Sequence, residues 1–186
     1  KMNIIIPMAG MGTRMRPHTL TIPKPLILVA GKPIVQHLIE EVSGFSNDKI
    51  DEIAFIVGNF CKEVENKLLN IAKSMGAEGK IYYQNQPLGT AHALLCAAES
   101  LKGPVLIAFA DTLFKSDVAN INPDYDGAIW VQKVEDPSAF GVVLTNENEL
   151  IKDFIEKPST PVSNLAIIGI YYFKDGCFLR NEMQNL

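Results

Sequence analysis

Apolar and amphipathic stretches alternate through the first 110 residues of the chain. Ile4, Ile5 and Ile6 follow one another without a polar interruption, which is typical of a strand buried on both faces. Other stretches carry apolar side chains at helical spacing, and Gly76 is placed to end one of these helices. The pattern predicts strands and helices in alternation, with strands at 3–7, 53–57, 81–84 and 105–110 and helices at 33–45, 62–75 and 90–101.

The remaining residues follow a different pattern, in which strand-like segments succeed one another before a final helix. Strands are predicted at 128–134, 140–144, 150–156 and 165–173, a turn at 146–148 and a helix at 177–186. Alternating strands and helices with short connections predict a parallel sheet that binds ligands at the carboxyl ends of its strands. Successive strands predict an antiparallel addition to that sheet. We therefore expect an α/β fold, a Rossmann-like three-layer sandwich with a mixed, mostly parallel central sheet.

Length and composition favour one globular domain over residues 1–186, because 186 residues with 47% hydrophobic content can form one sizeable core. The formal net charge of −4 argues against a nucleic-acid-binding surface. No apolar stretch approaches the ~20 residues that a membrane span requires. Cys61, Cys96 and Cys177 are odd in number and lack paired spacing, which disfavours disulfides and a zinc site. We expect a cytoplasmic protein that binds neither nucleic acid nor membranes.

Positive charge is concentrated near the N-terminus. Residues 1–39 contain five Lys or Arg and no acidic residue, a local charge of +5, whereas the remaining residues carry −9 to give the overall −4. The segment Met8-Ala9-Gly10-Met11-Gly12-Thr13-Arg14 directly follows the first strand, and its glycines allow backbone N–H groups to approach a ligand closely. An acidic protein with its cations gathered beside such a loop is suited to bind a small anion, such as a polyphosphate.

Two common nucleotide motifs are not matched. Gly10-x-Gly12 alone marks many ordinary turns, and Met15 stands where a dinucleotide fingerprint has its third glycine. Gly31-Lys32 is similar to the end of a P-loop, but Pro33 stands where Ser or Thr would bind Mg²⁺. The sequence therefore favours neither a dinucleotide-binding protein nor a P-loop NTPase.

A longer stretch is more specific. Residues 9–26, Ala-Gly-Met-Gly-Thr-Arg-Met-Arg-Pro-His-Thr-Leu-Thr-Ile-Pro-Lys-Pro-Leu, resemble the signature of the sugar-1-phosphate nucleotidyltransferases, which include thymidylyl-, uridylyl- and guanylyltransferases. Further matches follow in the family's order over essentially all 186 residues: Gln84-x-x-Pro87-x-Gly89-Thr90-Ala91, Asp111 after a buried strand, Phe140-Gly141-Val142-Val143, Glu156-Lys157-Pro158 and Ser163-Asn164-Leu165-Ala166. The resemblance implies a GT-A-like nucleotidyltransferase fold. It also implies that a sugar-1-phosphate attacks the α-phosphorus of an NTP and releases pyrophosphate.

The resemblance assigns residues to the nucleotide. Those of the phosphate loop are Met8, Ala9, Gly10, Met11, Gly12 and Thr13, and those near the base are Gln84, Pro87, Gly89 and Thr90. Arg14 corresponds to the catalytic cation that stabilises the leaving pyrophosphate, and Lys24 to the one that contacts the α-phosphate. Asp111 corresponds to a nucleotide-binding residue and Mg²⁺ ligand, although a carboxylate there could instead cap the backbone of residues 112–114. Gln84 could alternatively be a solvent-facing residue at a strand end.

The resemblance also assigns residues to the acceptor. Gly141, Glu156, Asn164 and Ile167 correspond to the sugar pocket, and Lys157 is the third catalytic cation, which holds the sugar phosphate. Lys24 and Lys157 each precede a proline, which disfavours helix at the lysine and predicts an extended backbone there. Lys32 also precedes a proline, but helix initiation explains that pair better.

We therefore expect a Mg²⁺-dependent enzyme, compatible with a homo-oligomer, that makes an NDP-sugar from a sugar-1-phosphate and an NTP, with dTTP or UTP favoured. Two alternatives are a cytidylyltransferase acting on an alcohol phosphate such as phosphocholine, and a non-catalytic regulatory relative that binds nucleotide sugars. The resemblance puts a second metal-binding aspartate beyond residue 186. This predicts that the chain lacks a C-terminal portion and binds NTP with little nucleotide-sugar synthesis.

Overall fold

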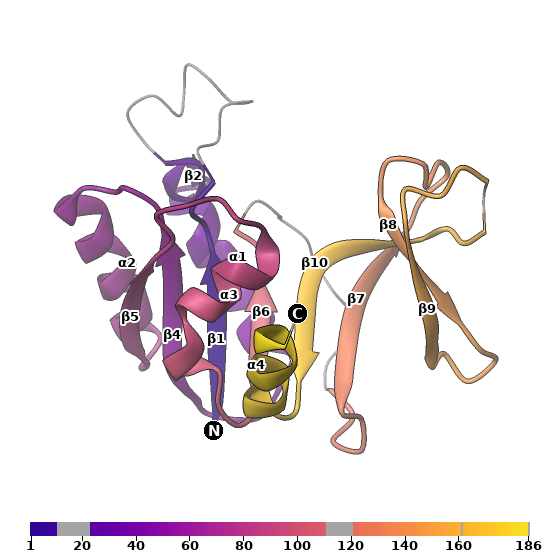
Figure 1. Ribbon diagram of the computed structural model, residues 1–186. Helices are drawn as coiled ribbons and strands as arrows, with labels where there is room; N and C mark the ends of the chain where they lie inside the picture. The colour runs from indigo at the N-terminus through magenta and orange to yellow at the C-terminus, as the bar shows by residue number, and fades with distance from the viewer. Residues whose placement is uncertain (11–22, 111–120, 161, 186) are drawn as a thin grey trace. The chain divides into compact units, whose positions relative to one another are not determined.

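The computed structural model describes residues 1–10, 23–110, 121–160 and 162–185 (Figure 1). The chain divides into two compact units, one formed by Lys1–Ala128 with Tyr172–Leu186 and the other by Ile129–Tyr171. Each unit has its own sheet segment. The single domain over 1–186 that composition favours stays a prediction.

The first unit is built on four parallel strands in the order β5-β4-β1-β6. Their bounds are β1 Met2–Pro7, β4 Ile50–Val57, β5 Glu78–Tyr83 and β6 Val105–Ala108. Strand β1 is buried along its whole length, and Ile4 pairs with Ile53 of β4 on one side and Leu106 of β6 on the other. This central position explains the uninterrupted apolar run from which the strand was predicted.

Helices cover both faces of this sheet. Their bounds are α1 Ile34–Ser43, α2 Lys62–Ser74, α3 Thr90–Cys96 and α4 Gly176–Gln184, with a 3₁₀ turn η3 at Ala98–Ser100. The chain moves from β1 to β4 to β5 in one direction and then returns to β6. Right-handed crossovers therefore put α1 and α2 on one face and α3 on the other, and α3 and α4 lie in front of the sheet in Figure 1. Among the described residues, no helix has the length and apolar character needed to cross a membrane.

The ends of the helices follow local chemistry. As predicted, α2 ends at a left-handed Gly76 (φ 72°), whose N–H bonds Lys73 O at 3.0 Å while the N–H of Ala77 bonds Ala72 O at 3.1 Å. The other helices are shorter than predicted. Helix α1 begins after Pro33, whose ψ of 143° is extended, and α3 ends before Ala97, where the chain turns into η3.

A short hairpin between the first strand and α1 was not predicted. It follows a 3₁₀ turn, η2 (Lys24–Leu26), and pairs β2 (Leu28–Val29) with β3 (Lys32–Pro33) in antiparallel fashion. Ala30 and Gly31 form its turn with positive φ values of 48° and 83°. Two-residue strands carry too few side chains for a period to be visible, so only the Ala-Gly pair marked the turn.

The second unit contains antiparallel strands. Strand β10 (Leu165–Phe173) pairs with β7 (Gly127–Lys133) and runs antiparallel to β8 (Gly141–Thr145), which runs antiparallel to β9 (Ile151–Glu156). The predicted turn between β8 and β9 is present, because Asn146 Oδ1 accepts from the N–H groups of Asn148 and Leu150, both at 2.9 Å. The fold is thus α/β with a mixed, mostly parallel sheet, as the sequence predicted.

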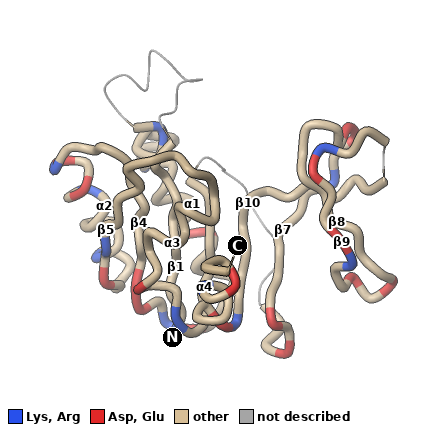
Figure 2. Tube along the Cα trace, viewed as in Figure 1, with Lys and Arg blue, Asp and Glu red and all other residues tan. Residues whose placement is uncertain are grey.

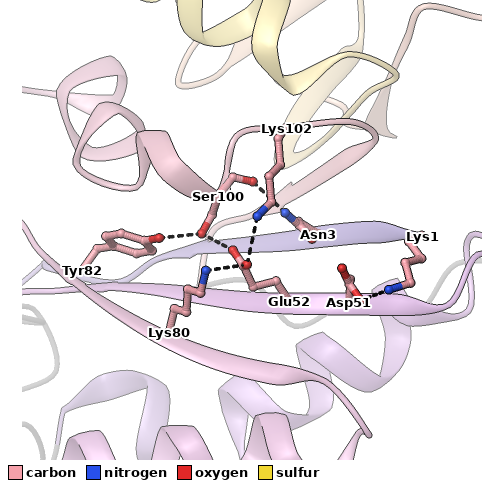
Figure 3. A network of polar contacts seen from close by, with 8 residues as sticks. All are labelled: Lys1, Asn3, Asp51, Glu52, Lys80, Tyr82, Ser100 and Lys102. Carbon is pink, nitrogen blue, oxygen red and sulfur yellow. Dashed lines mark hydrogen bonds and ion pairs between the residues drawn. The ribbon is translucent and has the colours of Figure 1, made fainter.

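A buried polar network lies near the amino-terminal ends of β1 and β4, opposite the edge where those strands end (Figure 3). Figure 2 shows charged residues gathered at these amino-terminal ends, whereas the middle of β1 carries none. Glu52, only 4% exposed, accepts from the Ser100 hydroxyl and forms ion pairs with Lys80 at 2.7 Å and Lys102 at 3.4 Å. Since the Ser100 proton goes to Glu52, the Tyr82 hydroxyl donates to Ser100 Oγ at 2.8 Å. The network joins β4, β5 and η3.

Burial alone would raise the pKa of Glu52, but hydrogen bonds from Lys80 and Ser100 and the positive charges of Lys102 and Lys80 together hold it below its ordinary value. A carboxylate whose pKa is lowered by folding stabilises the protein above its unfolded pKa. This contribution is lost as the pH falls through the folded pKa.

We expect Glu52→Gln to lower the free energy of unfolding at pH 7 by about 1.5–3 kcal/mol, because charged hydrogen bonds in a buried setting are lost. The difference from the wild type should shrink as the pH falls below the ordinary carboxyl pKa of 4.5. Urea unfolding at pH 7 and pH 4 measures both effects. Asp51→Asn, which removes the neighbouring exposed carboxylate paired with Lys1, is the matched control and should unfold like the wild type. A pH-independent difference for Glu52→Gln would contradict this account.

Candidate functional site

The segments that follow strands β1, β5 and β6 meet at one edge of the parallel sheet (Figure 1). Three backbone hydrogen bonds hold them there: Met8 N–H to Ile56 O at 2.8 Å, Gln84 N–H to Val57 O at 2.8 Å and Ala110 N–H to Pro7 O at 3.4 Å. Of the three donors, Met8 begins the predicted phosphate loop and Gln84 is the predicted base contact. Ala110 directly precedes Asp111 in the sequence. The carboxyl edge of a parallel sheet is where ligands bind in folds of this kind.

The described part of the phosphate loop comprises Met8, Ala9 and Gly10. Exposure increases along it, from a buried Met8 to an exposed Gly10. Gly58, at the end of β4, was not predicted to belong here, yet a Cβ on it would lie 3.1 Å from Ala9 O. A small residue at position 58 therefore allows the loop to pass close to β4. Met11, Gly12, Thr13, Arg14 and Asp111 lie outside the described residues.

The predicted base-binding segment has a defined hydrogen-bonding pattern. Gly89 adopts φ 99° and ψ −176°, a backbone conformation essentially restricted to glycine, directly before Thr90 begins α3. Its carbonyl accepts from Ala93 N at 3.1 Å and from the side-chain amide of Gln84 at 3.2 Å. The same amide nitrogen lies 3.1 Å from His92 Nδ1. The Gln84 side chain is therefore held by the loop and helix that follow it, whereas Pro87 is exposed.

A second group of side chains braces the end of β5 beside Gln84. Tyr83 donates its hydroxyl to Glu65 Oε1 at 2.7 Å, and Lys62 pairs with Glu65 Oε2 at 2.8 Å. The hydrogen bonds from Lys62 and Tyr83 lower the pKa of Glu65, and the hydrogen bond to Glu65 raises the pKa of Tyr83. This contact ties the start of α2 to the last residue of β5.

Lys24 has a different backbone from the one its proline suggested. It is the first residue of η2, its carbonyl accepts from Ile27 N–H at 3.1 Å, and its side chain is half-buried. The predicted extended backbone is therefore wrong here, because Pro23 and Pro25 both tolerate the first turn of a 3₁₀ helix. The cation is still held on a short, ordered turn.

In the second unit, three of the residues assigned to the sugar pocket converge. Gly141 on β8 is opposite Glu156 on β9 in the strand register. A Cβ on Gly141 would lie 3.0 Å from Glu156 Oε2 and 3.6 Å from Ile167 Cδ1 on β10. A carboxylate and a methyl group thus lie over a position without a side chain. That arrangement suits a polyhydroxylated ring, which offers both hydroxyl groups and apolar C–H surface.

The other two residues assigned to the acceptor lie on the same unit. Asn164 is exposed, and its carbonyl accepts from Val134 N–H at 3.0 Å. Lys157 Nζ lies 3.7 Å from Glu156 Oε1, and both side chains are largely exposed. Burial, together with the negative charge of Glu156, raises the pKa of Tyr171 on β10. No cluster of three or more His, Cys, Asp or Glu able to hold a metal ion occurs within the described ranges.

The Lys157 backbone is strained rather than extended. Its φ of 44° lies in the left-handed region, and its N–H donates to Phe140 O at 3.0 Å. The sequence correctly excluded a right-handed helix before Pro158 but missed this alternative, because the hydrogen bond to Phe140 comes from a neighbouring segment. Strain of this kind persists only where the surrounding structure fixes the residue.

A parallel sheet with loops gathered at its carboxyl edge, joined to an antiparallel extension, defines an α/β protein of the three-layer type. The family model of the nucleotidyl transferases matches residues 3–185, so the chain belongs to this family. It is 37% identical over 188 residues to the mannose-1-phosphate guanylyltransferase catalytic subunit beta of Drosophila melanogaster. It is also 37% identical over 177 residues to the bifunctional protein GlmU of Methanocaldococcus jannaschii. These alignments cover 97% and 95% of the chain but only 50% and 41% of the relatives, so the chain spans about half their length or less.

Two solved structures are similar over nearly the whole chain. One is a protein of Bacillus anthracis assigned as a glucose-1-phosphate thymidylyltransferase, in complex with a sucrose, with a TM-score of 0.78 and 25% identity. That match covers 95% of this chain and 72% of the other. The second is a UDP-glucose pyrophosphorylase complexed with UDP-glucose, with a TM-score of 0.74, 25% identity, and coverage of 98% and 78%. The family predicted from the sequence is confirmed.

The strain at Lys157 can be tested by two replacements that remove the same amine. Lys157→Gly should exceed Lys157→Ala in unfolding free energy by about 1 kcal/mol, because glycine adopts positive φ without strain. Urea denaturation of the two variants gives the difference directly. At Lys152, in the extended strand β9, the same pair should show the opposite order, since glycine is there the less stable residue. Equal stabilities at position 157 would show that the backbone is not strained.

Proposed function

We propose that the protein transfers a nucleotidyl group from an NTP to a sugar-1-phosphate, forming an NDP-sugar and pyrophosphate. The family supports this reaction class, and the relatives named above are nucleotidyltransferases of sugar phosphates or resemble them in fold. The observation that carries the proposal is that Met8, where the predicted phosphate loop begins, lies with Gln84 and Ala110 at one edge of the parallel sheet. The chain retains Arg14, Lys24, Asp111 and Lys157, which favours catalysis over the regulatory alternative.

In this reaction an oxygen of the sugar phosphate attacks the α-phosphorus of the NTP, and the bond from that phosphorus to the bridging oxygen breaks. The electron pair leaves with pyrophosphate. The protein has to hold two anions in line and neutralise the charge that develops. We assign Lys24 to the α-phosphate, Arg14 to the leaving pyrophosphate and Lys157 to the phosphate of the acceptor. The Gly10 to Thr13 backbone would bind the β- and γ-phosphates, and Glu156 the sugar hydroxyls.

Magnesium is part of the proposal, with Asp111 as the protein ligand. A carboxylate that follows a buried strand at the phosphate edge has the hard oxygen donors that Mg²⁺ prefers. Ala110, held against Pro7 by its N–H, fixes the chain at that edge immediately before Asp111. When bound, the ion would neutralise phosphate charge during transfer.

We expect the nucleotide to be dTTP or UTP from the sequence, and the similarity to a guanylyltransferase makes GTP a further candidate. The names of the relatives and of the similar structures include a guanylyltransferase, a thymidylyltransferase and a UDP-glucose pyrophosphorylase. All three cysteines are free thiols, consistent with a reducing compartment such as the cytoplasm.

A panel of pyrophosphate-release assays over NTPs and sugar-1-phosphates tests the proposal. Lys24→Ala should lower turnover by about 10² to 10³, the typical cost of losing one preorganised charge-stabilising group. Lys32→Ala is the matched control. Lys32 also precedes a proline, but its Nζ lies 2.8 Å from Glu40 Oε2 on α1, so the Lys32→Ala variant should be as active as the wild type. Pyrophosphate release by Lys24→Ala at the wild-type rate would contradict the assignment of Lys24 to the α-phosphate. Release with phosphocholine and CTP alone would favour the cytidylyltransferase.

The acceptor pocket can be tested at Gly141. An added methyl group would lie 3.0 Å from Glu156 Oε2, so Gly141→Ala should fold normally but displace this flexible carboxylate. We expect affinity for the sugar-1-phosphate to fall roughly tenfold to a hundredfold, the weight of one charged hydrogen bond. Isothermal titration calorimetry measures it. Gly44→Ala, at the right-handed end of α1, is the control and should bind like the wild type. Unchanged affinity in Gly141→Ala would show that Glu156 does not bind the sugar-1-phosphate.

A further inference from the structure

The orientation of the Gln84 carboxamide is fixed by its surroundings. The Gly89 carbonyl can only accept a hydrogen bond, so the group that faces it at 3.2 Å must be the amide nitrogen of Gln84. The Gly89 carbonyl is in turn held in place by the backbone conformation of Gly89, which is essentially restricted to glycine, and by the hydrogen bond that it accepts from the Ala93 N–H. If the carboxamide reversed, its oxygen would face the Gly89 carbonyl oxygen and the hydrogen bond would be lost, so the nitrogen and oxygen ends of the Gln84 side chain are distinguished.

This orientation defines the state of His92. The Gln84 amide nitrogen is a donor only, and it lies 3.1 Å from His92 Nδ1. Nδ1 must therefore carry a lone pair, and the proton of the neutral ring is on Nε2. Both N–H groups of the Gln84 amide are then used, one by Gly89 and one by His92. The carbonyl oxygen, Oε1, has no partner among the described residues and is the end left for a ligand.

We propose that His92 is a positioning residue that selects the nucleobase, by holding Gln84 so that it presents only a hydrogen-bond acceptor. The inference rests on the proposed function and adds the class of base to it. An acceptor matches a base whose ring nitrogen carries a proton next to a carbonyl group. Uracil and thymine have such an N3–H and guanine has such an N1–H. Cytosine N3 and adenine N1 carry lone pairs, which would face the lone pairs of Oε1.

The position of His92 in the chain explains why a helix residue can act in this way. Gln84 follows β5, and His92 lies in the first turn of α3, so the two belong to consecutive elements joined by a short loop. Both side chains are half-buried. A histidine here supplies a second acceptor for the Gln84 amide, in addition to the Gly89 carbonyl. No other described side chain is hydrogen-bonded to the Gln84 amide.

The geometry can be tested without any substrate. Long-range ¹H–¹⁵N NMR of the imidazole rings reports which nitrogen carries the proton, and near pH 8 we expect His92 in the Nε2–H form. Gln84→Ala identifies any His92 signal that depends on the contact. A protonated Nδ1 on His92 would overturn the inference, whatever the protein is found to catalyse.

The selection of the base is tested by binding. We expect the wild type to bind UTP, dTTP or GTP more tightly than CTP and ATP. His92→Phe keeps a ring but removes the acceptor, so its affinity for the preferred NTP should fall roughly three- to tenfold, about the weight of one neutral hydrogen bond. Its preference for UTP over CTP should shrink, because the carboxamide can then turn. His92→Asn places an oxygen where Nδ1 was and should restore both quantities to within about twofold, as expected if that single acceptor bond is regained.

Thermal melting of each variant shows whether it is folded. His37→Phe is the control, because His37 Nε2 donates to Val29 O at 2.7 Å in another part of the first unit, and its base preference should not change. Unaltered UTP-over-CTP preference in folded His92→Phe would overturn the role of His92. Failure of His92→Asn to restore binding would do the same. Absence of NTP binding by the wild type would overturn the proposed function and the base selection together, while the NMR result would still stand for the geometry.

Discussion

The pairing of β1 between β4 and β6 is the interaction on which the rest of the first unit depends. A strand buried on both faces and hydrogen-bonded on both edges has little freedom to shift, because a change of register would break two ladders at once. Its last residues therefore lead the chain to Met8 and Gly10 at a defined position. The same constraint brings Ala110 and Gln84 to that edge through bonds to Pro7 and Val57. The buried Glu52 network secures the opposite ends of the strands.

Much of the fold could be predicted because its elements have long, regular patterns. The eight strands of the large sheet, the four principal helices and the Gly76 helix end all follow from spacing and turn chemistry. The hairpin β2–β3 was missed because two residues show no period. The extended backbone conformations predicted for Lys24 and Lys157 were wrong for another reason. A proline restricts its predecessor, but which of the remaining conformations is chosen depends on neighbours that only the folded chain supplies.

For the candidate site, the sequence supplied residue assignments that stay predictions. Residue types such as Gln84, Glu156 and Lys157 could be assigned by resemblance, and the structure brings Gly141, Glu156 and Ile167 together. The residues that were missed, Gly58 and His92, act on other residues rather than on a ligand. Gly58 provides room for Ala9 and His92 accepts from Gln84. A lone glycine or histidine in a sequence gives no sign of such a role, because its partner belongs to a different element of the fold and comes into contact with it only after folding.

The carbonyl of Gly89 accepts from both the first turn of α3 and the Gln84 side chain. This shared acceptor has an evolutionary consequence, since any replacement of Gly89 would disturb the start of α3 and the orientation of the Gln84 side chain, the proposed base contact, in one step. Few related proteins could therefore change their nucleotide preference by a substitution at position 89. Position 92 has ordinary helical geometry, and its histidine codons reach several polar residues by a single base change. If Gln84 contacts the base as proposed, divergence in nucleotide choice is therefore more accessible through residue 92 of α3 than through Gly89.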